Sequence, residues 1–292
     1  MDILVVHLFN ALLYASVLFL IAGGLSLIYG VMRIVNLAHG NLFALGAFVT
    51  ASVVGQWFAG STSPFLYLLL PAGAVAAALV GAILEPTLLR PFYQRPEEYQ
   101  LLVTYGVLMI LEDLMRFVWG PYPVSATTLF EKMGSMKVGE WIYPRYNLLV
   151  IAIGGIAAVF LWTFIYRTRF GVLLRATSQD MKRASALGVN VNRVYVLAFT
   201  IGCFMAGLAG AIIVPGQSAV LGMGVDALVL SFIVVVIGGL GSLDGAMVGA
   251  LIVGVLREIA ISTFPELELA VLYLIAAVVL LVRPAGLFGR AT

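Results

Sequence analysis

The sequence predicts an all-α integral membrane protein: a polytopic bundle of about nine transmembrane helices, within roughly eight to ten, with broken or re-entrant segments and a short cytoplasmic helix. Three observations support this prediction. Of the 292 residues, 62% are hydrophobic and only 10% are charged, whereas about a quarter of the residues in a soluble domain are charged. The apolar residues form runs of about bilayer length. The basic residues gather in a few segments between these runs.

The number of spans follows from the thickness of the bilayer. A hydrocarbon core of about 30 Å and a helical rise of about 1.5 Å per residue require roughly 20 mostly apolar residues. The stretch from Asp226 to Ser262 is too long for one crossing and barely long enough for two, and the segment Gly238 to Ser242 is its natural break. With that break, the predicted spans are residues 8–29, 40–59, 65–84, 101–119, 147–166, 194–213, 226–241, 245–263 and 267–283.

The Lys and Arg residues predict the orientation, because cytoplasmic loops carry an excess of them. The longest basic segment runs from Arg167 to Arg193, and alternation of the spans puts eleven of the 16 Lys and Arg residues on its side. These are Arg33, Arg90, Arg95, Arg167, Arg169, Arg175, Lys182, Arg183, Arg193, Arg283 and Arg290. The three in outer loops are Lys132, Lys137 and Arg145. We therefore expect the N-terminus outside and the C-terminus in the cytoplasm. The longest outer loop, residues 121–146, either docks a partner or only connects two spans.

The rare residue types exclude several classes of function. The formal net charge of +2 is too small to suggest a nucleic-acid partner. Cys203 is the one cysteine, so neither an intramolecular disulfide nor a thiolate metal site is available. The two histidines, His7 and His39, lie far apart, so we expect no zinc-protease site, no metal and no catalytic residues. The first apolar run has no basic leader, and we expect it to be retained as the first helix.

A short helix is predicted within the basic segment of residues 167–193. Thr177 or Ser178 can cap its start, and Asp180 suits the positive end of its dipole. Gly188 can adopt the left-handed conformation that ends a helix, which gives a length of about ten residues. So short a helix is marginal alone in water and must pack on something.

The same short helix has a narrow apolar face, because Met181, Ala184 and Leu187 recur at helical spacing. Two interpretations are open. The helix either lies on the lipid surface, held by its basic residues, or fits a groove in a cytoplasmic partner.

Four stretches carry a family resemblance. The pattern Arg175-Ala-x-x-x-Asp180-x-x-x-Ala184-x-x-Leu187-Gly188, followed at once by a span, resembles the coupling segment of permeases of binding-protein-dependent ABC importers. The other three are Val-Asn-Leu-Ala-His-Gly at 35–40, Gly-Gly-Leu-Gly-Ser-Leu-Asp-Gly-Ala at 238–246 and Val-Arg-Pro-Ala-Gly-Leu-Phe-Gly-Arg at 282–290. Together, and in this order, they resemble the LivH-type subunit of branched-chain amino-acid importers over nearly the whole chain. Ser185 departs from the wider pattern, which prefers alanine there.

The resemblance implies one permease domain over residues 1–292 of a multi-pass protein in the cytoplasmic membrane. It implies a second related permease, with a heterodimer expected, two cytoplasmic ATPases and an external substrate-binding protein. No lysine of the chain follows a glycine, so a Walker A motif is absent, the chain has no cofactor of its own, and the partners must bind the ATP. The residues implied to couple to the ATPases are Arg175, Asp180, Lys182, Arg183, Ala184, Leu187 and Gly188.

The substrate implied by the resemblance is a branched-chain or related aliphatic amino acid. Similar permeases resemble carriers of urea, short amides and aromatic acids, which remain alternatives. An ion-coupled secondary transporter is a rival class, but it would not need the basic cytoplasmic segment.

Five charged residues well inside predicted spans are candidates for structural roles. Glu112 and Arg116 are four residues apart with Asp113 beside them, so we expect this trio to face the bundle. An internal ion pair that locks helices is favoured over a polar lining for a zwitterion. Arg257 and Glu258 are adjacent and point about 100° apart, so we expect at least one to meet another helix in a structural role.

The substrate pathway is predicted at two glycine-containing segments. The segment from Asn36 to Asn41 is expected at the inner end of the second span, where the helix start exposes unpaired N–H groups that could meet a carboxylate. His39 there is either a substrate contact or, more commonly for a lone histidine, a satisfied hydrogen-bonding residue. Small residues elsewhere either line the pathway or let helices approach closely. The candidate pathway residues are Asn36, His39, Gly40, Asn41, Gly239, Gly241 and Ser242.

Overall fold

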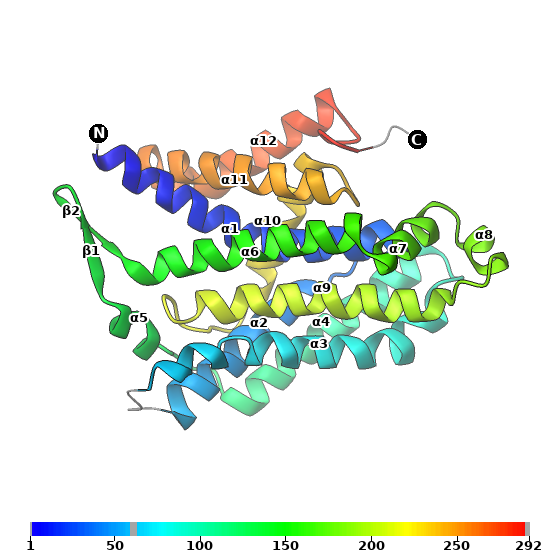
Figure 1. The fold of residues 1–292 in the computed structure, drawn as a ribbon, viewed down its shortest axis with the longest axis horizontal. Coiled ribbons are helices and arrows are strands. Elements are labelled where there is room, and N and C mark those ends of the chain that lie inside the picture. The colour runs from blue at the N-terminus through cyan, green and yellow to red at the C-terminus, as the bar shows by residue number, and fades with distance from the viewer. Residues whose placement is uncertain (1, 59–62, 290–292) are drawn as a thin grey trace.

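The computed structural model describes residues 2–58 and 63–289. Over these residues the chain is a helical bundle in which a helical segment coincides with each of the nine predicted spans, which confirms the fold class (Figure 1). These segments are α1 (Asp2–Met32), α2 (His39–Thr50) with η1 (Ala51–Trp57), η2 (Pro64–Leu69) with α3 (Ala72–Leu84), η3 (Glu85–Leu89) and η4 (Arg90–Phe92), α4 (Glu97–Trp119), α6 (Arg145–Arg167), α9 (Val191–Ile213), α10 (Met223–Gly238), α11 (Leu243–Thr263), and η5 (Pro265–Leu267) with α12 (Glu268–Val282).

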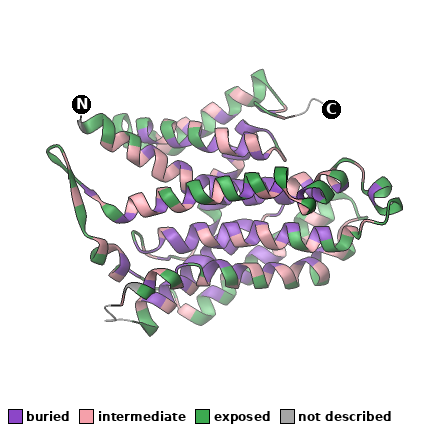
Figure 2. Ribbon diagram, in the orientation of Figure 1, coloured by how far each residue is buried: buried purple, intermediate pink, exposed green. Residues whose placement is uncertain are grey.

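Six of these segments, within the described residues, are long and apolar enough to cross a membrane by length and composition alone. The exceptions are α2 and α10, which are short, and α4, which carries several charges. The outward sides of α6 and α12 are exposed and apolar, as expected of lipid-facing helices, whereas α2 and α9 are largely buried (Figure 2).

Close helix packing in the centre depends on glycine. A Cβ atom on Gly46 of α2 would lie 2.2 Å from the carbonyl oxygen of Gly207 in α9, and one on Gly73 of α3 would lie 2.0 Å from the carbonyl oxygen of Gly46. Three helices therefore meet backbone to backbone. In a bilayer such contacts stabilise the bundle through dispersion forces, since lipid tails are as apolar as leucine.

Helix α2 begins inside the bundle instead of at its surface. The chain reverses at Arg33, which has φ of 57°, and residues 33–38 run back along the bundle to His39. His39 Nε2 donates to the carbonyl oxygen of Ile21, 3.0 Å away. Ile21 lies eleven residues before Met32, the last residue of α1, which is about 16 Å along a helix. The start of α2 is thus at mid-membrane depth, and the prediction that it lies at the inner end of the span is wrong, because the chain runs back into the bundle before the helix begins.

Helix α10 also begins within the membrane. It has 16 residues, about 24 Å of helix, and its start packs against the start of α2. A Cβ atom on Gly40 would lie 1.9 Å from the carbonyl oxygen of Gly224. At its other end, Leu287 N–H donates to Ile237 O and Phe288 N–H to Gly238 O, each at 2.9 Å. The tail motif therefore packs on the inner end of α10, while its last residue, Arg290, lies outside the described residues.

The outer loop departs from the all-helical prediction. Residues 121–146 contain a short helix, α5 (Thr128–Met133), and an antiparallel hairpin of β1 (Ser135–Val138) and β2 (Trp141–Pro144). The two strands pair from Ser135 with Pro144 to Val138 with Trp141, and Gly139 has φ of 62° at the turn. This loop has a folded structure of its own at the end of the bundle opposite α8 (Figure 1).

Replacing Gly46 with alanine is predicted to destabilise the bundle. The new Cβ would meet backbone that cannot move without shifting α9, and overpacking of this kind costs about 1–3 kcal/mol. The matched control is Gly155→Ala on α6, where a Cβ meets nothing within 4 Å. Thermal unfolding in detergent should show a lower midpoint for Gly46→Ala and an unchanged or slightly higher one for Gly155→Ala. Equal midpoints would contradict this account of the packing.

Candidate coupling segment and translocation site

The basic segment forms two helices, α7 (Arg169–Gln179) and α8 (Met181–Ala186). Thr168 caps α7 by accepting from Gly171 N–H at 3.1 Å. The Arg175 guanidinium donates to the carbonyl oxygen of Ile165 and lies 5.5 Å from the ring centre of Tyr166. Arg175 therefore ties α7 to the end of α6 and does not extend freely toward a partner.

The start of the short helix was predicted wrongly. Asp180, not Thr177 or Ser178, is its cap: the Asp180 carboxylate accepts from Arg183 N–H at 3.0 Å and pairs with Arg183 Nε at 2.9 Å. Thr177 and Ser178 lie within α7. Because Asp180 has extended backbone, with φ of −154°, it separates the two helices and leaves α8 only six residues long.

The side chains of α8 are also oriented differently from the predicted apolar face. Ala184 is buried, at 4% exposure, whereas Leu187 is 85% exposed. Lys182 and Arg183 are exposed as well. Gly188 has φ of 87° and ends the helix as predicted. The free surface of α8 is thus basic, with exposed apolar side chains at its two ends, Met181 and Leu187, and Ala184 holds the helix against its own chain.

A polar network that the sequence analysis missed lies behind α8. Tyr195 of α9 donates from its hydroxyl to Met181 Sδ at 3.3 Å, and its ring meets that of Tyr93 edge to face at 5.3 Å. Tyr93 in turn donates to Glu85 Oε1 at 2.5 Å, and Arg90 pairs with Glu85 Oε2 at 2.7 Å.

Burial, and then the hydrogen bond to Glu85, raise the pKa of Tyr93, so its hydroxyl stays a donor. Glu85 itself has no exposed surface. The signal in the sequence was this lone acid at the inner end of a span, with Arg90 five residues later. A buried carboxylate requires hydrogen-bonding or charged partners, and Arg90 could supply one.

The predicted pathway residues at the start of α2 all lie in the interior of the chain. Asn36, His39, Gly40 and Asn41 are buried. Asn41 Nδ2 donates to Leu108 O at 2.7 Å, and His39 bonds to α1 as described above. The helix start that was expected to be open is thus covered by the start of α10. His39 has the position of a hydrogen-bonding packing residue, and its Nδ1 atom is buried without a partner among the described residues.

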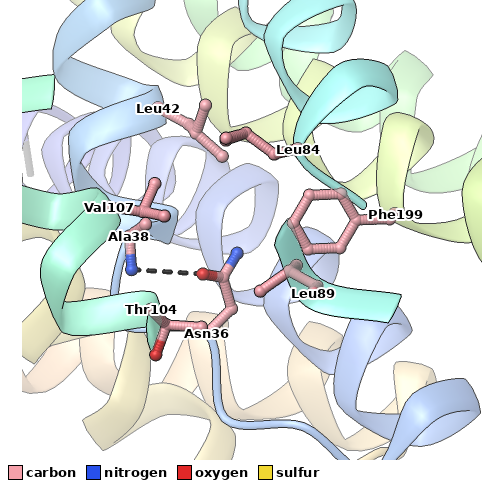
Figure 3. A pocket seen from close by; sticks show the side chains of 8 residues that line it. All are labelled: Asn36, Ala38, Leu42, Leu84, Leu89, Thr104, Val107 and Phe199. Atoms are coloured by element: carbon pink, nitrogen blue, oxygen red, sulfur yellow. Dashed lines mark hydrogen bonds between the residues drawn. The ribbon is translucent and has the colours of Figure 1, made fainter. Parts of the chain in front are cut away.

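Asn36 occupies a small cleft between α2, α3, α4 and α9 (Figure 3). Its Oδ1 atom accepts from Ala38 N–H at 3.1 Å, while its Nδ2 atom finds no partner among the described residues. The cleft walls are apolar except for Thr104, whose hydroxyl lies 3.4 Å from Val35 O. This cleft is enclosed within one chain and is too narrow for an amino acid.

The second glycine segment forms the turn between α10 and α11. Gly239 and Gly241 have φ of 107° and 76°, which favours glycine. Ser242 caps α11 by accepting from Gly245 N–H at 3.0 Å, and its carbonyl accepts from Ser26 at 3.0 Å. The structure places these residues in a tight turn at the C-terminal end of α10, against α1 and the tail.

Arg257 and Glu258 do not pair with each other, as predicted, and both meet other helices. Glu258 accepts from His7 Nδ1 at 2.7 Å and from Asn10 Nδ2 at 3.0 Å. Arg257 donates to Glu268 and stacks on Tyr14 of α1, 4.2 Å from the ring centre. These contacts link α1, α11 and α12.

The trio on α4 was predicted to face the bundle, and for two of its members this is wrong. Glu112 turns inward and accepts from Gly222 N–H, just before α10, at 2.8 Å. Asp113 and Arg116 turn outward, with side chains 76% and 61% exposed, and pair loosely with each other at 3.7 Å. The expected partner of Arg116 was Glu112. Residues three and four positions apart on a helix are neighbours, so Asp113 and Glu112 were both within reach of Arg116, and the bond from Gly222 N–H holds Glu112 away from it.

Comparison with known proteins identifies the family. A model of the branched-chain amino acid transport system permease component matches residues 7–281. This chain belongs to that family. The match confirms the resemblance seen in the four sequence stretches. Within the described residues no three His, Cys, Asp or Glu side chains gather as metal ligands would.

Individual relatives cover most of the chain. It is 30% identical over 295 residues to the high-affinity branched-chain amino acid transport system permease protein LivH of Salmonella typhimurium, covering 97% of this chain and 95% of the relative. It is 27% identical to BraD of Pseudomonas aeruginosa, over 97% and 95%. The ribose import permease protein RbsC of Escherichia coli is 26% identical, over 86% and 77%. The structure of PsaBC from Streptococcus pneumoniae in complex with Fab shares the fold, with a TM-score of 0.50 and 17% identity over 94% of this chain and 90% of that one.

Burial of Ala184 generates a prediction that distinguishes packing from partner contact. Ala184→Glu would place an unpaired carboxylate inside the chain, at a cost of several kcal/mol, and should loosen α8. The control is Ser185→Glu, because Ser185 is the adjacent exposed residue. Limited trypsin digestion of the isolated permease should cleave at Lys182 and Arg183 faster in Ala184→Glu than in the control. Equal cleavage rates would refute the buried position of Ala184.

Proposed function

We propose that this chain is the transmembrane permease subunit of an ABC importer that moves branched-chain or related aliphatic amino acids inward, powered by separate ATPases. The observation that carries the proposal is the family match over residues 7–281. The names of the LivH and BraD relatives support the substrate class. The absence of a glycine before any lysine supports separate ATPase subunits.

The proposed contact with the ATPase is α8, which projects from one end of the bundle (Figure 1). Leu187 supplies an apolar tip, Lys182 and Arg183 supply charge, and Asp180 fixes the helix start. Arg175, Ala184 and Gly188 act indirectly, by holding the segment in shape. An amphipathic helix on lipid would instead expose a broad apolar face, whereas the exposed apolar side chains here, Met181 and Leu187, lie at the two ends of α8 with the buried Ala184 between them.

The proposed assembly follows from this division of labour. The permease pairs with a second related permease, two ATPases bind the α8 end, and a substrate-binding protein docks at the outer end, where α5 and the β1–β2 hairpin form a folded surface. The N-terminus lies outside and the C-terminus in the cytoplasm, in agreement with the excess of basic residues on the α8 side.

The orientation is tested by cysteine labelling in a Cys203→Ser background. Ser135 in the outer hairpin and Ser185 on α8 are both exposed. A membrane-impermeant maleimide added to intact cells should label Ser135→Cys and should label Ser185→Cys only after the cells are opened. Labelling of both from outside would overturn the proposed orientation.

The function is tested by reconstituting the complete complex with its ATPases and binding protein in proteoliposomes. Leucine uptake should require ATP and the binding protein, and Leu187→Asp should reduce uptake and bound ATPase together, because a charge replaces the apolar tip. Leu240→Asp is the control, since Leu240 is another exposed leucine at the inner end. Uptake driven by an ion gradient without ATP would refute the proposal. Uptake of urea or aromatic acids in place of leucine would correct the substrate.

A further inference from the structure

The exposed charges of α4 lie within the hydrocarbon region. The polar start of α4 ends at Gln100, and Asp113 and Arg116 follow 13 and 16 residues later, which is about 20 and 24 Å along the helix. A hydrocarbon core about 30 Å thick includes both positions. Asp226 of α10 is also exposed and lies twelve residues before Gly238, about 18 Å from the inner end.

Exposure of these three charges to lipid would cost free energy. A charge near the centre of the bilayer costs about 2.5–3.5 kcal/mol on insertion scales. The pairing of Asp113 with Arg116, at 3.7 Å with both side chains largely exposed, offsets little of this cost. Other charges within spans are treated differently: Glu85 is fully buried and paired, and Glu258 is 7% exposed and accepts two hydrogen bonds. The surface of α4 must therefore be covered by protein or water.

The face of α4 that carries Asp113 and Arg116 is exposed along much of the helix. Leu102, Tyr105, Met109, Asp113 and Arg116 recur at intervals of three or four residues and share one side, and all are exposed. Gly106 on this side has open space where a side chain would be. The stripe is apolar toward the inner end and charged with both signs toward the outer end. Asp226 lies one turn beyond Gly222, which Glu112 of α4 holds.

We propose that this stripe, with Asp226, lines the amino-acid pathway, and that the second permease subunit forms the opposite wall. This inference rests on the proposed function and names its site. The carboxylates of Asp113 and Asp226 suit an ammonium group, the Arg116 guanidinium suits a carboxylate, and Met109 and Tyr105 suit an aliphatic side chain. The charges are exposed and hydrated, so their contacts with a zwitterion are weak, which allows the substrate to leave.

The first measurement tests whether the stripe is accessible to water. In a Cys203→Ser background and in the assembled complex, Met109→Cys should react with a positively charged methanethiosulfonate. The control is Ile156→Cys in α6, which lies at similar depth on its helix, is 70% exposed and should not react. Protection of Met109→Cys by leucine during ATP-driven uptake would support the pathway directly. An unreactive Met109→Cys, or equal reaction at both positions, would overturn the inference.

The second arm uses Asp113→Asn, Arg116→Gln and Asp226→Asn, with Glu266→Gln in η5, an exposed residue outside the stripe and the hairpin, as control. Each pathway variant should lower the maximal uptake rate about tenfold per assembled complex, with the half-saturation concentration unchanged. Loss of assembled complex with a normal rate per complex would mean that these charges only join subunits, against the inference. Because wild-type uptake tests the proposed function by itself, an active wild type with unaffected variants would refute the pathway and leave the function standing.

Discussion

The absence of water from the hydrocarbon core is the constraint on which the rest of this structure depends. Each polar group inside the bundle must find a partner in the protein, and the chain meets this requirement with specific contacts. Glu258 accepts hydrogen bonds from His7 and Asn10 of α1. Glu85 pairs with Arg90 and accepts a hydrogen bond from Tyr93. These contacts tie together helices that apolar packing alone would hold weakly in lipid. Charges that stay exposed at membrane depth are exceptions to this pattern, and by the same constraint each must lie beside water or beside another protein surface.

The starts of two helices meet inside the bundle, and glycine makes this contact possible. Gly40 and Gly224 bring the starts of α2 and α10 into backbone contact. Both helix starts carry partial positive charge, so their approach would be unfavourable without an acceptor nearby. The carboxylate of Glu112 supplies one by accepting from Gly222 N–H. Glu112 is therefore held at the start of α10, whereas Asp113, about 100° round the helix from it, stays on the exposed side of α4.

The sequence predicted the spans well because bilayer thickness fixes their length, and small shifts at their ends do not change the count. It predicted less of the site, for reasons that can be traced to particular residues. Thr177, Ser178 and Asp180 are all good helix caps, and local sequence cannot choose among them. The burial of Ala184 and of His39 depends on neighbours far away in the chain, such as Ile21 for His39. The β1–β2 hairpin was missed because its strands are only four residues long.

Contacts with α9 hold α8 in place although it is so short. Six residues have little stability of their own, yet Met181 accepts from Tyr195 of α9, and the Tyr195 ring packs on Tyr93, which is bonded to Glu85. Under the proposed function, a displacement of α8 by the ATPase acts on α9 through these side chains. Helix α9 packs on α2 and α3 at Gly207, whose carbonyl oxygen lies 2.2 Å from the Cβ position of Gly46 and whose own Cβ position lies 3.0 Å from the carbonyl oxygen of Gly73. Because backbone contacts of this kind do not compress, motion of α9 must carry α2 and α3 with it. The start of α2 abuts the start of α10, so movement at α8 reaches the middle of the membrane through rigid elements.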